Sequence, residues 1–398
     1  MSAFLTEYFA SSASVQRQNA LYNAFSREFG KAELRWFSAP GRTELGGNHT
    51  DHQGGHVLAA AVNLDMLACA APNGTTFVRV LSAGFPPFTV DLSAADRLPY
   101  GTSASLVQGI AVCIRELGYP VGGVDICMDS LIPAGAGLSS SAAFEVLIGQ
   151  IFNTLFCDGE LSVIQLAQIG KRAENEWFGK PCGLMDQMAC AIGGIVAIDF
   201  GAGVPIAEQQ TQGTAEYTLC IIETGSGHAD LTDAYASIPA EMATVAAYFG
   251  KKLLSAVDPH AFWEAYPQLQ AVCSHRAILR AIHFFEEDAR AQAQAAALRV
   301  GNFEGFLELV RQSGRSSALY LQNVYASPFE QSVTLALAAA EHLLQGQGAV
   351  RVHGGGFAGT IQAWVPAAMV EDFRRDAQRL IGPCHALHIR DTGSICLN

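Results

Sequence analysis

The chain has 398 residues, of which 50% are hydrophobic and 15% charged, a composition that excludes an intrinsically disordered protein. Its length predicts roughly two or three domains. Its formal net charge of −13, with only five lysines, argues against a protein that binds nucleic acids or anionic membranes, because both need clustered basic side chains.

The first distinctive segment, residues 39–56, places polar side chains densely among glycines, as ligand-binding loops often do. Three interpretations are open. The segment could be a polar surface loop, or its amide, imidazole and carboxylate groups could hydrogen-bond the hydroxyls of a sugar. It could also hold a metal ion, although the spacing matches no standard zinc pattern. The candidate metal ligands would be His49, Asp51, His52 and His56.

The next signal combines a strand, a glycine-rich turn and a helix. Residues 124–129 alternate apolar and other side chains, which predicts a strand, and the apolar run 142–156 predicts a buried helix. Between them, residues 135–141 read Gly-Ala-Gly-Leu-Ser-Ser-Ser. Glycines let the backbone approach a ligand and a helix N-terminus offers free N–H groups, so a phosphate site is predicted. A flexible turn with a serine N-cap is the alternative, and the missing lysine excludes a Walker loop.

A further helix is delimited by two local signals. Ser162 and Gln165 match a capping box at its start, and Gly179 followed by Lys-Pro marks its end. Asp186 then follows among methionine, alanine and cysteine side chains. Because acidic residues are seldom buried unless they are paired or functional, Asp186 is either a working carboxylate or the N-cap of another helix.

The second half of the chain differs in pattern from the first. A weakly patterned, glycine-rich stretch at 200–213 is the candidate joint between domains. Beyond it we expect a strand, a mainly helical region and two short strands around a glycine turn, at 217–223, 228–345 and 350–365. Segregated helices and strands predict an α+β protein with an N-terminal domain at 1–205 and a C-terminal domain at 206–398.

The glycine turn from Gly354 to Gly359 satisfies G-x-G-x-x-G and raises the alternative of a nicotinamide-dependent oxidoreductase. A dinucleotide fingerprint opens a helix, whereas the next residues alternate as a strand does. The turn is therefore expected to be a glycine hairpin or a second wall of a nucleotide site.

Taken together and in this order, the segments beginning at Pro40, Pro133 and Glu174 resemble the three motifs of one kinase superfamily. Its members include galactokinase, homoserine kinase, mevalonate kinase and phosphomevalonate kinase. Pro-Gly-Arg before Asn-His-Thr-Asp, and Pro-Cys-Gly-Leu-Met-Asp-Gln, are similar to the galactokinase branch. The resemblance implies an N-terminal domain of the ribosomal-protein-S5 kind and a ferredoxin-like C-terminal domain. It also implies ATP-dependent phosphorylation of a monosaccharide, galactose first, at the anomeric hydroxyl.

The same resemblance implies residue roles, with Mg²⁺ as cofactor and ATP as co-substrate. The nucleotide phosphates would be held by Gly135, Ala136, Gly137, Leu138, Ser139, Ser140 and Ser141. Mg²⁺ would be coordinated by Ser141 and Glu174. Asp186 would act as general base, with Arg42 beside it. The sugar would be contacted by Arg42, Asn48, His49, Asp51, Asp186 and Tyr235.

Four positions depart from the galactokinase signature: Glu44 replaces Asn, Gly46 an aliphatic residue, Asn48 Glu, and His52 Tyr. The resemblance places Asn48 at the exocyclic hydroxymethyl group of the sugar, where an amide both donates and accepts. A related sugar or a uronic acid is therefore an alternative acceptor. A non-catalytic sugar sensor of the same fold is another alternative, although the residues given catalytic and metal-binding roles are intact.

The ten cysteines are scattered, form no C-x-x-C pair and lie mostly in apolar runs, so reduced thiols in a cytoplasmic protein are expected. No signal peptide or membrane-spanning run is recognisable in the sequence. We expect a monomer or small homo-oligomer whose partners are ATP and a monosaccharide.

Overall fold

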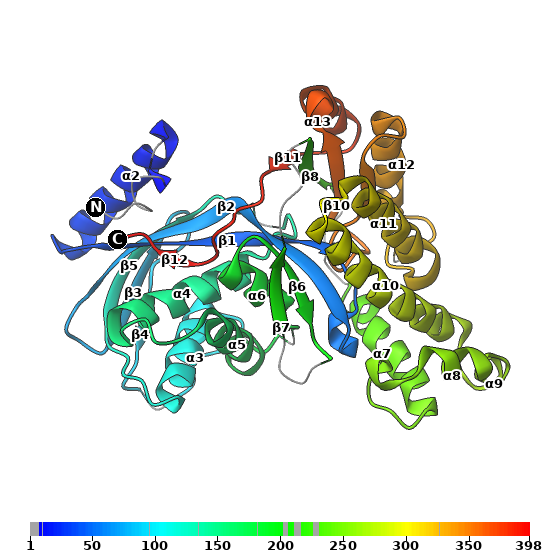
Figure 1. Ribbon diagram of the computed structural model, residues 1–398. Coiled ribbons are helices and arrows are strands. Elements are labelled where there is room, and N and C mark those ends of the chain that lie inside the picture. Colours follow the sequence, from blue (N-terminus) through cyan, green and yellow to red (C-terminus); the bar gives the residue numbers. More distant parts are fainter. Residues whose placement is uncertain are drawn as a thin grey trace.

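The computed structural model describes residues 8–9, 11–94, 96–133, 135–180, 182–201, 206–210, 216–225, 231–325 and 327–398. These residues form two β-sheets, each packed against helices (Figure 1). Helices and strands are segregated rather than alternating regularly, so the predicted α+β class is confirmed. No helix within the described ranges combines the length and apolar character needed to cross a bilayer.

The larger sheet contains eight of the described strands: β1 (Arg35–Gly46), β2 (His56–Pro72), β3 (Phe77–Ser82), β4 (Phe88–Asp91), β5 (Val124–Ser130), β6 (Ile195–Asp199), β7 (Ile206–Gln210) and β12 (Ile395–Cys396). Six follow the order β12–β1–β2–β5–β3–β4, while β6 pairs with β2 and β7 with β6. Neighbouring strands are antiparallel apart from β3 and β5, which are parallel. The predicted strand at 124–129 is confirmed as β5.

Helices cover both faces of this sheet (Figure 1). One face carries α3 (Ser103–Glu116), α4 (Ser140–Phe156), α5 (Val163–Ala173) and α6 (Met185–Ile192). The other face carries α2 (Ser12–Phe29). The side chains of β5 therefore divide between two cores, with Ile126 under α3 and α4 and Cys127 under α2. Because both faces of β5 are covered, its side chains as far as Asp129 are apolar on either face or, like Asp125 and Asp129, paired with an arginine.

The second sheet contains four of the described strands: β8 (Tyr217–Glu223), β9 (Ala349–Val352), β10 (Thr360–Pro366) and β11 (Cys384–Leu387). Their order is β11–β8–β10–β9, and their neighbours are antiparallel. With α13 (Val370–Leu380) between β10 and β11, and helices between β8 and β9, the arrangement is the βαββαβ pattern of ferredoxin-like domains. Because β10 follows the glycine turn, that turn does not open a helix and the dinucleotide alternative is wrong.

Helices dominate the chain between β8 and β9, as the sequence predicts for the described part of 228–345. They are α7 (Thr232–Tyr248), α8 (Pro259–Glu264), α9 (Tyr266–Val272), α10 (His275–Arg299), α11 (Phe303–Ser316) and α12 (Ser332–Leu344). Trp364 of β10 packs edge-on against Phe303 and Phe306 of α11. The core around them also includes side chains of β2 and α6, so it joins the two sheets.

Short helices complete the chain: η1 (Asp51–Gln53), η2 (Glu174–Phe178), η3 (Leu254–Ala256), η4 (Ser317–Leu321) and η5 (Ala367–Met369). The predicted capping box is present, with Ser162 and Gln165 bonding each other's backbone at the start of α5. A π-helical turn, η2, then extends α5 as far as Gly179, whose φ of +84° ends the helix.

The stretch 200–213 is not simply a joint, because residues 206–210 form β7 and pair with β6. The side chains of this stretch show no clear strand pattern. The strand forms because its backbone hydrogen-bonds the open edge of β6. The chain also returns to the larger sheet at its end, where β12 pairs with β1 close to the N-terminal helix (Figure 1). Sheet membership therefore crosses the predicted boundary at 205/206 twice.

Candidate active site

A cavity of about 290 Å³ lies where three sequence-predicted segments meet. Its walls come from the 135–141 turn, from the start of α6 at Asp186, and from the glycine turn at 354–356. Arg42 of β1 completes the wall between them. Residues that are far apart in the sequence are thus gathered at one polar hollow between the two sheets.

Arg42 and Asp186 form a bidentate ion pair at the centre of this wall. The Arg42 Nε and NH2 groups donate to the two carboxylate oxygens of Asp186, each at 2.7 Å. The Ser139 hydroxyl donates to the same carboxylate at 2.5 Å. Burial alone would raise the pKa of Asp186, but the Arg42 charge and these hydrogen bonds outweigh it and hold the pKa below its ordinary value. Asp186 is therefore an ionised carboxylate and not an N-cap.

A bulge in β1 aims Arg42 at the turn. The register with β2 shifts between Pro40 and Arg42, and the Arg42 N–H donates to the Leu138 carbonyl at 3.1 Å. The Arg42 NH1 group also donates to the Gly137 carbonyl at 2.7 Å. A Cβ on Gly41 would lie 2.8 Å from the Leu138 oxygen, so glycine is required for this close approach.

The predicted phosphate turn adopts positive φ at three alternate residues, Gly135 (+81°), Gly137 (+69°) and Ser139 (+54°). Ser139 occupies the N-cap position of α4, yet its hydroxyl bonds Asp186 and makes no cap, so the serine N-cap alternative is wrong there. Ala136 is fully buried in the core and does not line the cavity, whereas the other six predicted residues do. The N-terminus of α4 thus faces the hollow, as an anion site requires.

Three of the predicted sugar-binding residues each hydrogen-bond one carbonyl of the glycine turn. Asn48 donates to Gly354 at 2.7 Å, His49 to Gly355 at 3.0 Å, and Tyr235 to Gly356 at 2.8 Å. None of these three side chains lines the 290 Å³ cavity, which the glycines of the turn line instead. The structure therefore brings these residues to the back of the cavity wall.

The side chain of Asn48 is fully engaged within the protein. Its amide donates to Glu44 and Gly354, at 3.0 and 2.7 Å, and its carbonyl accepts from Ser317 and Asn323. Those four bonds use its whole hydrogen-bonding capacity, and its exposure is 0%. Asn48 thus braces the loop in this arrangement and has no group left for a sugar.

Glu44, another departure from the signature, is buried beside Asn48 and forms an ion pair with Arg351 of β9. Burial raises the pKa of the Glu44 carboxyl, although the nearby arginine charges oppose this effect. The pair links the segment 39–56 to the second sheet across 307 residues of sequence. The galactokinase signature has Asn at position 44 and Glu at position 48, and this chain has the reverse. The two side chains are bonded to each other, and Glu44 is also bonded to the second sheet.

Two histidines of the loop, His49 and His52, are paired with each other, and burial lowers the pKa of both. Since a carbonyl only accepts, His49 donates its Nε2–H to Gly355, and its Nδ1 accepts from His52 Nε2 at 3.2 Å. Burial lowers the pKa of His49 to about 3, and the His52 ring adds to this shift. His56 points elsewhere and pairs with Asp288 at 2.9 Å. Both nitrogens of His49 are in use and His56 is directed away, so the proposed metal site of this loop does not form.

The predicted magnesium ligand Glu174 lies beside a second buried carboxylate, Glu145 of α4. The Gln187 amide nitrogen donates to both, at 2.9 Å to Glu145 and 3.0 Å to Glu174. Lys180 donates to the other Glu174 oxygen at 2.9 Å. Burial and the Glu174 charge raise the pKa of Glu145 well above its ordinary value. The carboxylate of Glu174 and the hydroxyl of Ser141, which lines the cavity, are the hard oxygen donors that Mg²⁺ prefers.

Within the described residues, no three or more His, Cys, Asp or Glu side chains are grouped as an all-protein metal site. That finding is compatible with Mg²⁺, which usually takes one or two protein ligands and completes its shell with phosphates and water. The donors present therefore fit Mg²⁺ brought by a nucleotide and not a metal caged by the protein.

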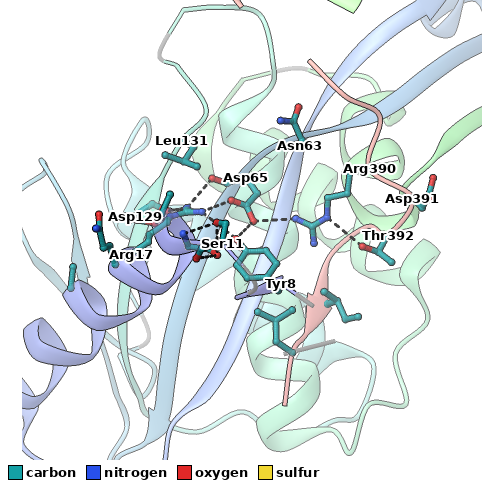
Figure 2. Close-up of a pocket in the computed structure, with 16 residues that line it drawn as sticks. Tyr8, Ser11, Arg17, Asn63, Asp65, Asp129, Leu131, Arg390, Asp391 and Thr392 are labelled. Atoms are coloured by element: carbon teal, nitrogen blue, oxygen red, sulfur yellow. Dashed lines mark hydrogen bonds and ion pairs between the residues drawn. The ribbon is translucent and has the colours of Figure 1, made fainter. Parts of the chain in front are cut away.

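A larger cavity, about 800 Å³, lies between α2, the larger sheet and the C-terminal segment (Figure 2). Asp65 at its floor accepts from Arg17 at 2.6 Å and from Arg390 at 3.1 Å. None of the residues predicted from the sequence to bind a ligand lines this cavity. The ion pairs of Asp65 join the N-terminal helix and the C-terminal segment to β2. The larger cavity is therefore a structural junction, and cavity size alone does not identify the active site.

Sequence reasoning missed several residues of the site. Lys180 lines the cavity and lies directly before the Pro-Cys-Gly-Leu-Met-Asp segment. Because the chain has only five lysines, a lysine next to this motif was a signal that could have identified it. His353 lines the cavity and links Thr43 of β1 to Thr360 of β10, with both distances 3.0 Å. Burial lowers the pKa of His353 to about 3, which keeps this link neutral. Such a link depends on the packing of the two sheets and has no local signal.

Two family models match parts of the chain. Residues 105–194 match the GHMP kinases N terminal domain, and residues 23–72 match the galactokinase galactose-binding signature. The fold is similar to that of Lactococcus lactis galactokinase, solved in complex with galactose, with a TM-score of 0.84 and 24% identity over 95% of this chain and 99% of that one.

More distant similarities extend over most of the chain. A D-glycero-D-manno-heptose 1-phosphate kinase from Bacteroides thetaiotaomicron has a TM-score of 0.61 and 18% identity, covering 91% of this chain and 98% of its own. The mevalonate kinase of Methanococcus jannaschii has a TM-score of 0.64 and 14% identity, covering 91% of this chain and 99% of its own.

The fold is thus the one shared by the galactokinase and mevalonate kinase structures, and residues 105–194 match the N-terminal domain of the GHMP kinases. Residues 23–72 match the galactose-binding signature of the galactokinases, so the resemblance read from the sequence is confirmed.

Proposed function

We propose that the protein transfers the terminal phosphoryl group of ATP to the anomeric hydroxyl of galactose, giving galactose 1-phosphate. The observation that carries this proposal is the Asp186 carboxylate, which Arg42 and Ser139 hold against the 135–141 turn. Phosphoryl transfer depends mainly on positioning and charge neutralisation, and this site supplies both. The galactose-binding signature over residues 23–72 supports the choice of sugar.

The backbone of the 135–141 turn and the N-terminus of α4 would hold the nucleotide phosphates, since residues of both line the cavity and a helix N-terminus offers N–H groups to an anion. Ser141 and Glu174 would hold Mg²⁺, which would neutralise charge on the transferring phosphates. Lys180 lines the same cavity and contributes a positive charge beside Glu174.

Asp186 would orient the anomeric hydroxyl and receive its proton. As the bond from the γ-phosphorus to the sugar oxygen forms, the bond to the ADP oxygen breaks and the hydroxyl becomes strongly acidic. Because its pKa lies below its ordinary value, Asp186 is a weak base and would accept the proton late in the transfer. The Arg42 guanidinium would then stabilise charge on the transferring group.

A neutral hexose fits the charges around the site better than a uronic acid. The cations that line the cavity, Arg42 and Lys180, each face a carboxylate already. The Asp51 carboxylate lies against Gly183, just before α6, so closely that a Cβ on Gly183 would overlap it. Asp51 therefore adds a further negative charge near Asp186. Among the described residues of the cavity, a sugar acid would therefore meet acceptors and no unpaired cation, while sugar hydroxyls would find acceptors for their protons. Sugar contacts by Asp51 and Tyr235 remain part of the proposal, whereas both nitrogens of His49 are already bonded within the protein.

The domain division at 205/206, the cytoplasmic location and the monomeric or small oligomeric state remain predictions. In the proposed division, the N-terminal unit supplies the phosphate turn and Asp186, and the C-terminal unit supplies the glycine turn and Tyr235.

The test is a panel of monosaccharides incubated with Mg-ATP and followed by mass spectrometry for an added phosphate. We expect galactose to be phosphorylated fastest and galacturonate to react at least tenfold more slowly. If galacturonate reacted faster than galactose, the proposed acceptor would be a sugar acid instead of galactose. No product from any sugar, with galactose binding intact by calorimetry, would favour the sugar-sensor alternative.

A further inference from the structure

Glu145 is a buried carboxylate that the sequence motifs assign to no role. It lies four residues after Ser141 on α4, so the two side chains share one face of the helix. Ser141 lines the cavity, and Glu145, at 0% exposure, lies one turn deeper. A carboxylate at this position therefore stands directly behind the proposed magnesium ligands.

The hydrogen bonds of Glu145 leave one oxygen free. Its Oε2 accepts from the Gln187 amide, which also holds Glu174. Its Oε1 is buried and accepts no hydrogen bond from the described residues, and the same is true of the Gln187 carbonyl oxygen. Buried acceptors without donors are costly, so two of them on side chains that hydrogen-bond each other indicate a donor that belongs there.

A glycine allows a neighbouring helix to pack closely against Glu145. Gly170 of α5 packs on it so closely that a Cβ there would lie 3.2 Å from the Glu145 Cβ and 3.3 Å from the Gln187 Cγ. Helices α4, α5 and α6 thus converge on the shared amide, and the carboxylates of Glu145 and Glu174 have Lys180 as their nearby cation. Burial and the Glu174 charge raise the pKa of Glu145, and a bound cation would favour the ionised form of both carboxyl groups.

We propose that the free oxygen of Glu145 accepts a hydrogen bond from a water molecule bound to Mg²⁺, and that Glu145 thereby helps to hold the metal at Ser141 and Glu174. Mg²⁺ retains several waters in protein sites, and partners of those waters and ligands tune its affinity. Glu145 is a positioning residue in this arrangement. The inference rests on the proposed kinase function, because it concerns the Mg²⁺ that accompanies ATP.

The test measures metal binding directly, without sugar turnover. Wild type and Glu145→Gln are saturated with a non-hydrolysable ATP analogue and titrated with Mn²⁺ as a spectroscopic substitute for Mg²⁺. We expect the Glu145→Gln variant to bind the metal about 10-fold to 100-fold more weakly, the usual effect of removing an outer partner of a metal site. Analogue affinity without metal is expected to change less than twofold.

A second readout separates this role from a purely structural one. In the presence of a chelator, Glu145→Gln should be at least as thermally stable as wild type, because the change removes repulsion between Glu145 and Glu174. A lower melting temperature together with unchanged metal affinity would overturn the proposal. Glu176→Gln is the matched control, since it removes a carboxylate that is 46% exposed and paired with Arg172 on the adjacent helix.

A crystal structure of the wild type with Mg²⁺ and the analogue provides a test that needs no variant. We expect a metal-bound water within hydrogen-bonding distance of Glu145 Oε1, and its absence would overturn the inference. If Glu145→Gln weakens metal binding while the wild type phosphorylates no sugar, only the proposed function fails. If galactose is phosphorylated and the variant binds metal normally, only the present inference fails.

Discussion

Replacing Asp186 by Asn tests the central element of the site with the smallest change in shape. The variant keeps one oxygen that can accept from Arg42 or Ser139, but it loses the charge and cannot take a proton. A positioned general base contributes about 10²–10⁴ in rate, so kcat should fall by that factor, which corresponds to an activation barrier raised by about 2.7–5.4 kcal/mol.

The same change should have a modest effect on stability. The Arg42 side chain is only 8% exposed and loses an ionised partner, while the side chain at position 186 is 33% exposed and partly screened. A hydrogen bond to a charged group is worth about 1.5–3 kcal/mol, which sets the expected loss in the free energy of unfolding. Galactose affinity should change by less than about fivefold, because the variant keeps the side-chain volume.

The assay combines initial rates at saturating galactose and Mg-ATP with calorimetric titration of galactose and a urea unfolding curve. Ser139→Ala is the matched control, since it removes one hydrogen bond to Asp186 and leaves the charge; its kcat should fall less than tenfold. If Asp186→Asn retained kcat within tenfold of wild type while its stability fell as expected, the assignment of Asp186 as the proton acceptor would be refuted.

Two further predictions concern stability. Asp65→Asn should lower the free energy of unfolding by about 3–5 kcal/mol, because it breaks buried ion pairs with Arg17 and Arg390; urea unfolding checks this, with the more exposed Asp129→Asn expected to cost less. Acidification should also destabilise the fold, because His353 is buried with a pKa of about 3, whereas an unfolded histidine titrates near 6.5 and therefore binds more protons below that pH. Between pH 6.5 and 5 His353 should contribute a loss of roughly 2 kcal/mol, with His49 adding to it, and equal stability at pH 7 and pH 5 would contradict this account.

Several parts of the site were predictable because their signals are local. The glycines at 135 and 137 adopt the positive φ that their residue type allows, and the capping box at Ser162 forms as its spacing predicts. The strand after Gly359 was also predictable, because its residues alternate over a short window. Each of these features depends on side chains within about one helical turn or one strand.

Other parts could not be read from the sequence. Asn48 carries an amide that suits a sugar, yet Glu44, Ser317, Asn323 and the glycine turn use all its hydrogen bonds. These partners lie up to 306 residues away, and no pattern around Asn48 identifies them. The strand β7 was missed for a related reason, because its pairing with β6 depends on the edge that β6 leaves and not on its own side chains.

By itself, the sequence determined which groups were present and how each short segment would turn: a cradle of glycines, an aspartate in apolar surroundings and an arginine after a proline and a glycine. Tertiary structure alone decided which of these groups meet. The Arg42–Asp186 pair, 144 residues apart, and the Gln187 amide shared by two carboxylates exist because β1, α4 and α6 pack together. Local conformation depends on neighbours along the chain, whereas the charge and hydrogen bonding of a buried group depend on whatever the fold places against it.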